Sequence, residues 1–246
     1  MNIPFSKYYG IKGPHGCFDK YQRMIDEIDL QANDKLIILG DALDRGPKPI
    51  SIIRDIMQRD NVELLLGNHE LFACRVLPYV DSPIDEITED FYDEEIKQKY
   101  YTWMFNGGNT SFEEFYPLGT EERKNILAFL RGLPTSMEIE INGKKFFLVH
   151  AGIENYTTDE ELGFLSAENF VWSSPTNFEV PFFDDPDRYL VFGHTPTFRI
   201  PDPKAETGKI FIKNNYIGID CGAVFDKYHG GRLGCIRLND MKEYYI

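Results

Sequence analysis

Residues 36–47 read LIILGDALDRGP, an apolar run followed at once by a polar turn bounded by two glycines. The run 36–39 is typical of a strand buried on both faces, and similar runs lie at 62–66, 146–149 and 189–192. Stretches with helical spacing of apolar residues lie between several of these runs. Alternation of buried strands with helices predicts an α/β fold.

The chain of 246 residues is expected to form a single domain over 1–246, because no Pro/Gly/Ser-rich linker divides it. Between about 71 and 135 strand signals are few and helical ones are frequent, which predicts a helical insertion. From Ser136 onward, turn pairs such as Asn142-Gly143 predict hairpins and therefore a sheet of mixed direction. Residues 5–12 are a poor strand by the same criteria, since they include Ser6 and Lys7.

The charge is strongly negative, with 26 Lys plus Arg against 40 Asp plus Glu and a formal net charge of -14. Such a surface repels phosphate backbones and argues against general nucleic-acid binding. An anionic substrate must therefore meet a local positive site. Eight acidic residues lie within 81–95, a pattern more typical of a solvated face or loop than of a dedicated partner site.

The expected location is the cytoplasm. The apolar runs are far shorter than the roughly 18 residues of a spanning helix, and the first residues have no export-signal pattern. The four cysteines are scattered, as expected for reduced thiols. No membrane association is expected, and the sequence does not specify an oligomeric state.

Four of the five histidines lie in glycine-flanked contexts, namely His15, His69, His150 and His194. Three of these four, and also Asp41, follow an apolar run within three residues, and the carboxyl ends of strands in an open α/β sheet converge on one crevice. Each motif alone has a purely structural explanation as a turn, a helix N-cap or a core histidine. Their joint occurrence favours a shared metal site, whose nitrogen and oxygen donors suit manganese, iron or zinc.

The motifs resemble, in order and spacing, those of the calcineurin-like metallophosphoesterases: Gly40–Pro47, Gly67–Glu70, His150–Gly152 and Gly193–Pro196. Within that family the chain is most similar to bacterial and phage serine/threonine phosphatases, through Trp103–Thr110, Val171–Pro175 and Ile219–Gly222. The resemblance runs from about His15 to Leu238. It implies a two-sheet metallophosphoesterase sandwich flanked by helices, with a helical cap insertion.

The resemblance also implies a role for each site residue. Two divalent ions, manganese first and iron or zinc as alternatives, would hold the attacking hydroxide. The implied metal ligands are His15 for the first ion, Asp41 as the bridge, and Asn68, His150 and His194 for the second ion. The implied catalytic residues are His69 as general acid, Asp44 as the group that orients it, and Arg45 as the phosphoryl clamp.

Two positions depart from the family pattern. Gly13 stands where the family has an aspartate ligand of the first metal, so that site is expected to be weakened. A lost ligand, an altered chain start and a first strand in a different register all stay open as explanations. Ser174 lies near a position where the bacterial branch often has a second phosphate-binding arginine, for which Arg188 or Arg199 could substitute.

These observations predict a metal-dependent phosphoesterase, foremost a serine/threonine-type protein phosphatase acting on a phosphoprotein or a small phosphoester. One alternative is a symmetrical dinucleoside tetraphosphate hydrolase, against which Asp44 argues modestly because that branch has Asn before the arginine. The other is a weakly active or inactive scaffold, as a consequence of Gly13.

Overall fold

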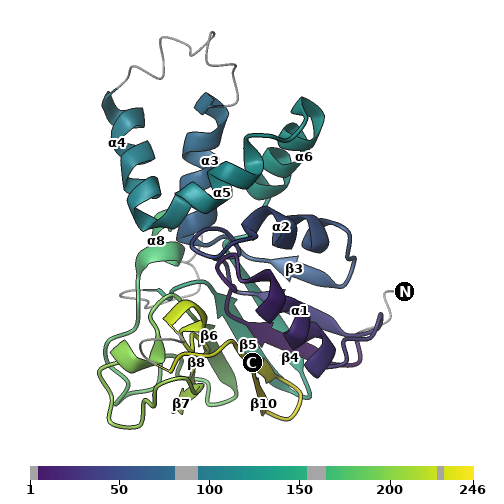
Figure 1. Ribbon diagram of the computed structural model, residues 1–246. Coiled ribbons are helices and arrows are strands. Elements are labelled where there is room, and N and C mark those ends of the chain that lie inside the picture. Colours follow the sequence, from purple (N-terminus) through teal and green to yellow (C-terminus); the bar gives the residue numbers. More distant parts are fainter. Residues whose placement is uncertain (1–4, 81–93, 154–164, 226–229) are drawn as a thin grey trace.

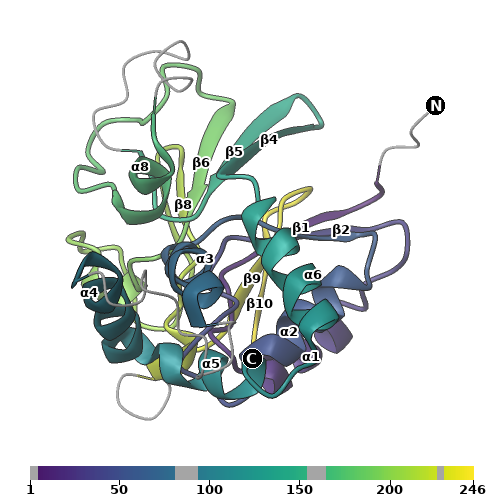
Figure 2. The same ribbon diagram turned by 90° about the horizontal axis from the view of Figure 1, so that it is seen from above.

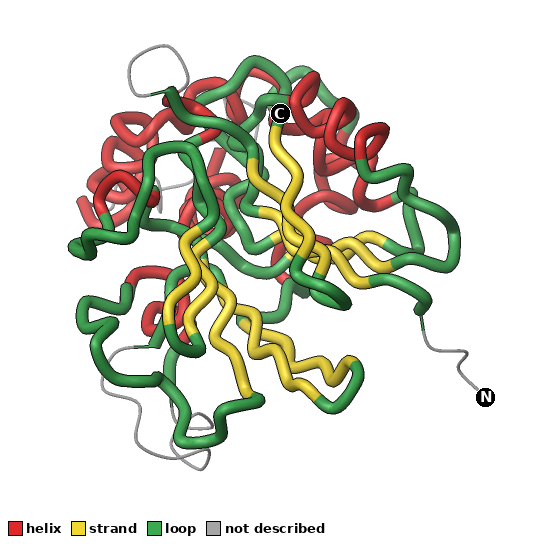
Figure 3. The backbone as a smooth tube through the Cα atoms, turned by 90° about the horizontal axis from the view of Figure 1, so that it is seen from below, coloured by secondary structure: helices red, strands yellow, loops and turns green. Residues whose placement is uncertain are grey.

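The computed structural model describes residues 5–80, 94–153, 165–225 and 230–246. Within these ranges the strands form two five-stranded sheets, which Figure 3 shows lying against each other. The first sheet has the order β10 (Lys242–Tyr245), β9 (Gly234–Arg237), β1 (Tyr8–Ile11), β2 (Lys35–Ile38) and β3 (Val62–Leu64). The second has the order β4 (Ser136–Ile141), β5 (Lys144–Val149), β6 (Arg188–Phe192), β8 (Tyr216–Gly218) and β7 (Phe211–Lys213).

The apolar runs are explained by burial of both faces of each sheet. Ile37 and Leu39 pack against the second sheet, including Leu148, whereas Leu36 and Ile38 pack against helices. Side chains alternate between the two faces of a strand, so a strand covered on both faces needs an uninterrupted apolar run. The α/β prediction is confirmed.

Helices cover the outer face of each sheet. Figure 2 shows α1 (Phe18–Glu27), α2 (Pro49–Met57) and α6 (Thr120–Arg131) on the side of the first sheet, and α8 (Ala167–Trp172) on the side of the second. Phe170 of α8 belongs to the apolar cluster on the outer face of the second sheet. The layers are therefore helix, sheet, sheet and helix, as predicted for the sandwich.

The cap stands at one end of the sandwich in Figure 1. It consists of α3 (Asn68–Val80), α4 (Glu94–Trp103), a π-helical turn (Met104–Gly108), α5 (Asn109–Phe115) and α6. These helices overlap the stretch at about 71–135 where the sequence predicted a helical insertion, but the first of them begins three residues earlier, at Asn68. Residues 81–93 of the acidic stretch lie outside the described residues. None of the helices in the described ranges is long and apolar enough to cross a membrane.

The sheets place the carboxyl ends of their parallel strands at one edge. β1, β2 and β3 are mutually parallel neighbours in the first sheet, as are β5, β6 and β8 in the second. The poor strand signal at 5–12 was misleading, because β1 is the central strand of the first sheet. Tyr9 and Ile11 fill its helix-facing side, while Gly10 faces the second sheet and contributes no side chain. Register pairs Ile11 with Ile38, so the first residue beyond the strand is Lys12.

Candidate active site

The polar residues that follow the strand ends adopt unusual backbone conformations. Left-handed φ values occur at His15 (45°), Asp41 (58°), Asp44 (68°), Arg45 (66°) and His194 (64°). A non-glycine residue in this region costs roughly 1–3 kcal/mol, and such residues cluster at functional sites. Sharp turns therefore direct these side chains back over the strand ends.

Four donor atoms from residues that follow four different strands form one cluster. His150 Nε2 lies 3.0 Å from Asn68 Oδ1, 3.3 Å from His194 Nδ1 and 3.5 Å from Asp41 Oδ2, and Asn68 Oδ1 lies 3.1 Å from His194 Nδ1. Atoms bound to one ion at about 2.1 Å lie roughly 3.0–3.4 Å from one another in tetrahedral or octahedral geometry. The spacing and chemistry of this cluster, which we call the four-donor cluster, therefore fit a divalent metal ion.

The protonation of the two histidines supports this fit. His150 Nδ1 lies 2.7 Å from the carbonyl oxygen of Leu39, to which it donates, so the lone pair of Nε2 faces the cluster. Burial lowers the pKa of His150 well below its usual value and that of His194 to about 4. Both imidazoles are therefore neutral at pH 7, as metal ligation requires.

A second possible cluster, formed by His15, Asp41 and His69, differs from the first. Arg45 donates from Nη1 to His15 Nε2 at 3.0 Å and from Nη2 to His69 Nε2 at 2.9 Å. Lys12 Nζ donates to Asp41 Oδ2 at 2.7 Å. His15 and His69 thus each already accept from the same guanidinium, and Asp41 Oδ2 is shared with the four-donor cluster, so these residues do not present a separate ligand set for a second ion.

Gly13 cannot supply the missing carboxylate. A Cβ atom at this position would lie 1.9 Å from the carbonyl oxygen of Gly40 and 2.4 Å from the carbonyl carbon of Asp41. Contacts this short with backbone atoms exclude any side chain without a local rearrangement. The glycine is therefore explained by close packing of two backbone turns.

The predicted acid, His69, is held by a buried carboxylate. His69 Nδ1 lies 2.6 Å from Asp44 Oδ2, and neither residue is exposed to solvent. Two cap residues complete the contacts of Asp44: Trp103 donates from Nε1 to Oδ2 at 2.8 Å, and Ser111 donates from Oγ to Oδ1 at 2.5 Å. The cap therefore positions the Asp44–His69 pair.

Glu70 holds the two turns that carry Asp41 and Asn68. Its carboxylate accepts from the backbone N–H groups of Asp41 at 2.7 Å, Gly67 at 3.0 Å and Leu43 at 3.1 Å. Burial and the nearby Asp41 raise the pKa of Glu70 to about 7. Glu70 therefore acts as a positioning group for these two turns.

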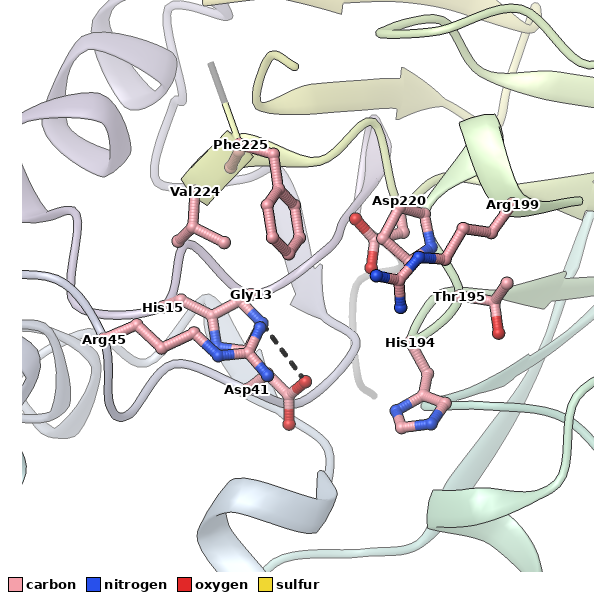
Figure 4. A pocket seen from close by; sticks show the side chains of 12 residues that line it. Gly13, His15, Asp41, Arg45, His194, Thr195, Arg199, Asp220, Val224 and Phe225 are labelled. Atoms are coloured by element: carbon pink, nitrogen blue, oxygen red, sulfur yellow. Dashed lines mark hydrogen bonds and ion pairs between the residues drawn. The ribbon is translucent and has the colours of Figure 1, made fainter. Parts of the chain in front are cut away.

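A cavity of about 180 Å³ opens beside these residues, and Figure 4 shows the side chains that line it. Arg45 and Arg199 approach it from opposite sides, which provides the local positive site that an anionic substrate needs in a chain of net charge -14. Arg188 is at the far end of β6, where it pairs with Glu138 at 2.7 Å. Of the two arginines considered from sequence, Arg199 is the one in the cavity.

The sequence comparisons agree with this geometry. The family model for calcineurin-like phosphoesterases matches residues 14–217. The chain belongs to the calcineurin-like phosphoesterase family. It is 24% identical to the symmetrical bis(5'-nucleosyl)-tetraphosphatase of Chromobacterium violaceum, over 97% of this chain and 94% of that protein. The corresponding protein of Dechloromonas aromatica is 23% identical, over 97% and 95%.

Solved structures of family members share the fold. A putative diadenosine tetraphosphatase superposes with a TM-score of 0.63 at 16% identity, covering 100% of this chain and 94% of that one. A metallophosphoesterase from Sphaerobacter thermophilus gives 0.54 at 16% identity, covering 98% and 88%. This member of the family is therefore a hydrolase of the metallophosphoesterase fold, and the family implies divalent metal ions.

The structure brings together all eight residues that the sequence singled out: His15, Asp41, Asp44, Arg45, Asn68, His69, His150 and His194. Their individual roles stay predictions. Sequence reasoning missed Lys12, Glu70 and Ser111 as members of the site. Trp103 lies in a motif noted for its resemblance to the family, but nothing in the sequence linked it to Asp44.

Proposed function

We propose that this chain hydrolyses phosphate monoesters with an alkoxide leaving group, foremost phosphoserine and phosphothreonine in proteins. The observation that carries the proposal is the buried contact of 2.6 Å between His69 Nδ1 and Asp44 Oδ2. A carboxylate in this place accepts a hydrogen bond from Nδ1, fixes the orientation of the ring and attracts a protonated imidazole. An alkoxide must be protonated as it leaves, so a general acid of this kind serves such substrates most.

The residues of the chain divide the remaining work. Arg45 and Arg199 bind the phosphoryl oxygens from two sides of the cavity. His69 Nε2 accepts from Arg45 Nη2 at 2.9 Å in the structure, so Arg45 must turn to the phosphoryl oxygens before Nε2 can carry a proton and pass it to the leaving oxygen. Asp41, Asn68, His150 and His194 would hold a divalent ion, manganese as the first choice, which would supply Lewis-acid polarisation and lower the pKa of a bound water.

A second candidate is hydrolysis of dinucleoside tetraphosphates. It is supported by the curated relatives, which bear this name and match 97% of the chain. A nucleotide leaves as a weakly basic phosphate anion, so the Asp44–His69 pair would add little to its departure. The geometry of this pair therefore ranks the monoesterase first.

The test compares kcat/KM for three substrates in the presence of manganese: a phosphoserine peptide, an aryl phosphate and diadenosine tetraphosphate. His69→Asn should lower turnover of the phosphopeptide by roughly 10²–10⁴ and turnover of the aryl phosphate much less. Equal losses on both would remove the acid role. A higher kcat/KM for diadenosine tetraphosphate than for the peptide would favour the second candidate.

A further inference from the structure

Lys12 is the buried cation of the site that the proposed reaction does not use. Its side chain is 3% exposed, and its Nζ lies 2.7 Å from Oδ2 of Asp41, which is equally buried. Asp41 is the carboxylate expected to bridge two metal ions. An ammonium group therefore contacts the oxygen that a bridging carboxylate would offer to an ion.

The fold places the lysine there firmly. β1 ends at Ile11, so Lys12 is the first residue beyond the strand end, level with the turn that carries Asp41. Its stem packs under the turn before His194, because a Cβ atom on Gly193 would lie 2.5 Å from Lys12 Cδ. The stem thus packs against the turn that carries one of the predicted metal ligands.

Among the residues that the structure describes, the turn that carries Gly13 and His15 offers no free ligand for a first ion. Gly13 has no room for a side chain, as shown above, and His15 Nε2 accepts from Arg45. The four-donor cluster, by contrast, has its donor atoms at the spacing of ligands around one ion. The two halves of the expected dinuclear site therefore differ: one fits an ion and the other is filled by a cation from the chain.

We propose that the Lys12 ammonium takes the place of the first metal ion, so that this chain binds one divalent ion per molecule, in the four-donor cluster. The inference rests on the proposed function, since it concerns the same site, but metal content tests it without any measurement of turnover. Lys12 neutralises the buried Asp41, and its positive charge repels a second divalent ion. It is a positioning residue for Asp41 and supplies part of the positive charge of the site.

The experiment is equilibrium dialysis of the full chain against Mn²⁺, with bound metal measured by inductively coupled plasma mass spectrometry. We expect one equivalent for the wild type and a loss of this equivalent in His194→Ala. Two equivalents in the wild type, or none, would overturn the inference. Electron paramagnetic resonance provides an independent readout, because one isolated Mn²⁺ gives a six-line spectrum without exchange coupling to a second ion.

Variants at position 12 test the role of the charge. Lys12→Asp should bind a second equivalent, whereas the matched control Lys12→Arg, which keeps the charge, should bind one. Lys12→Met, which has a side chain of similar length without a charge, should bind a second ion more weakly than Lys12→Asp does. It also keeps the test valid if Lys12→Asp fails to fold. The same count in all three variants would overturn the inference.

Failure of the inference and failure of the proposed function give different results. One bound ion without hydrolysis of phosphate monoesters would refute the proposed function and leave the inference intact. Two bound ions with monoester hydrolysis would do the reverse.

Discussion

Asp44→Asn separates the charge of the Asp44 carboxylate from its shape. The amide oxygen can still accept from His69 Nδ1 and Trp103 Nε1, and the amide N–H can donate to Ser111 Oγ, so the local geometry should persist. What is lost is the attraction between the carboxylate and a protonated His69. For charge centres about 4 Å apart at an effective dielectric constant of about 20, this attraction is about 4 kcal/mol.

We therefore expect Asp44→Asn to lower kcat for a phosphoserine peptide by roughly 10²–10³, and kcat for an aryl phosphate by less than about tenfold. The assay is steady-state hydrolysis of both substrates at pH 7 and saturating manganese. Asp55→Asn is the matched control, because the Asp55 carboxylate also accepts hydrogen bonds from a hydroxyl group and from an arginine side chain but lies on α2, outside the site. An equal fall in kcat on both substrates, or no fall on either, would refute the account of His69 as an acid held by Asp44.

Trp103→Phe removes the indole donor to the buried Asp44 and should lower the free energy of unfolding by about 1.5–3 kcal/mol in urea titrations. The control Tyr101→Phe changes an exposed residue of the same helix and should leave the free energy of unfolding nearly unchanged. Equal effects of the two substitutions would contradict the stabilising role of the Trp103–Asp44 hydrogen bond. Arg199→Ala should raise KM for phosphate esters at least tenfold while Arg188→Ala does not, and the opposite order would move the phosphate site away from the cavity. The metal-free protein should lose stability as the pH falls from about 6.5 towards 5, because the unfolded chain then takes up protons that the buried His150 and His194, with their lowered pKa values, do not. Each histidine contributes at most about 1.4 kcal/mol per pH unit to the slope of the unfolding free energy against pH, and Glu70, whose pKa is raised, offsets one histidine between about pH 7 and 4.5. An unfolding free energy that stays flat or rises as the pH falls through this interval would contradict the neutral, buried state of His150 and His194.

Most of the fold was accessible from local sequence signals. Strands covered on both faces need continuous apolar runs, and such runs mark β2, β5 and β6, whereas β3 is interrupted by the partly exposed Glu63. β1 has no such run, and its burial results from the strands and helices packed around it. Gly10 faces the second sheet without a side chain, so the apolar run of this strand is interrupted at a buried position.

The site residues at strand ends could be predicted from the sequence, whereas contacts between distant segments could not. Asp41 and His150 directly follow strand-like runs, so topology alone predicts that they meet. Trp103 is 59 residues from Asp44 in sequence and Ser111 is 67, and no local pattern predicts those contacts. Lys12 was missed for a different reason. Lysine is rarely buried, and its flexible stem gives no sequence signal of where its charge lies.

The most direct test of the metal site is an anomalous difference map from crystals of the protein grown with Mn²⁺. We predict one peak, roughly 2.2 Å from Asp41 Oδ2, Asn68 Oδ1, His150 Nε2 and His194 Nδ1, with Lys12 Nζ still in contact with Asp41. The absence of any peak there would contradict the four-donor cluster as a metal site, and a second peak between His15 and Asp41 would contradict the role of Lys12.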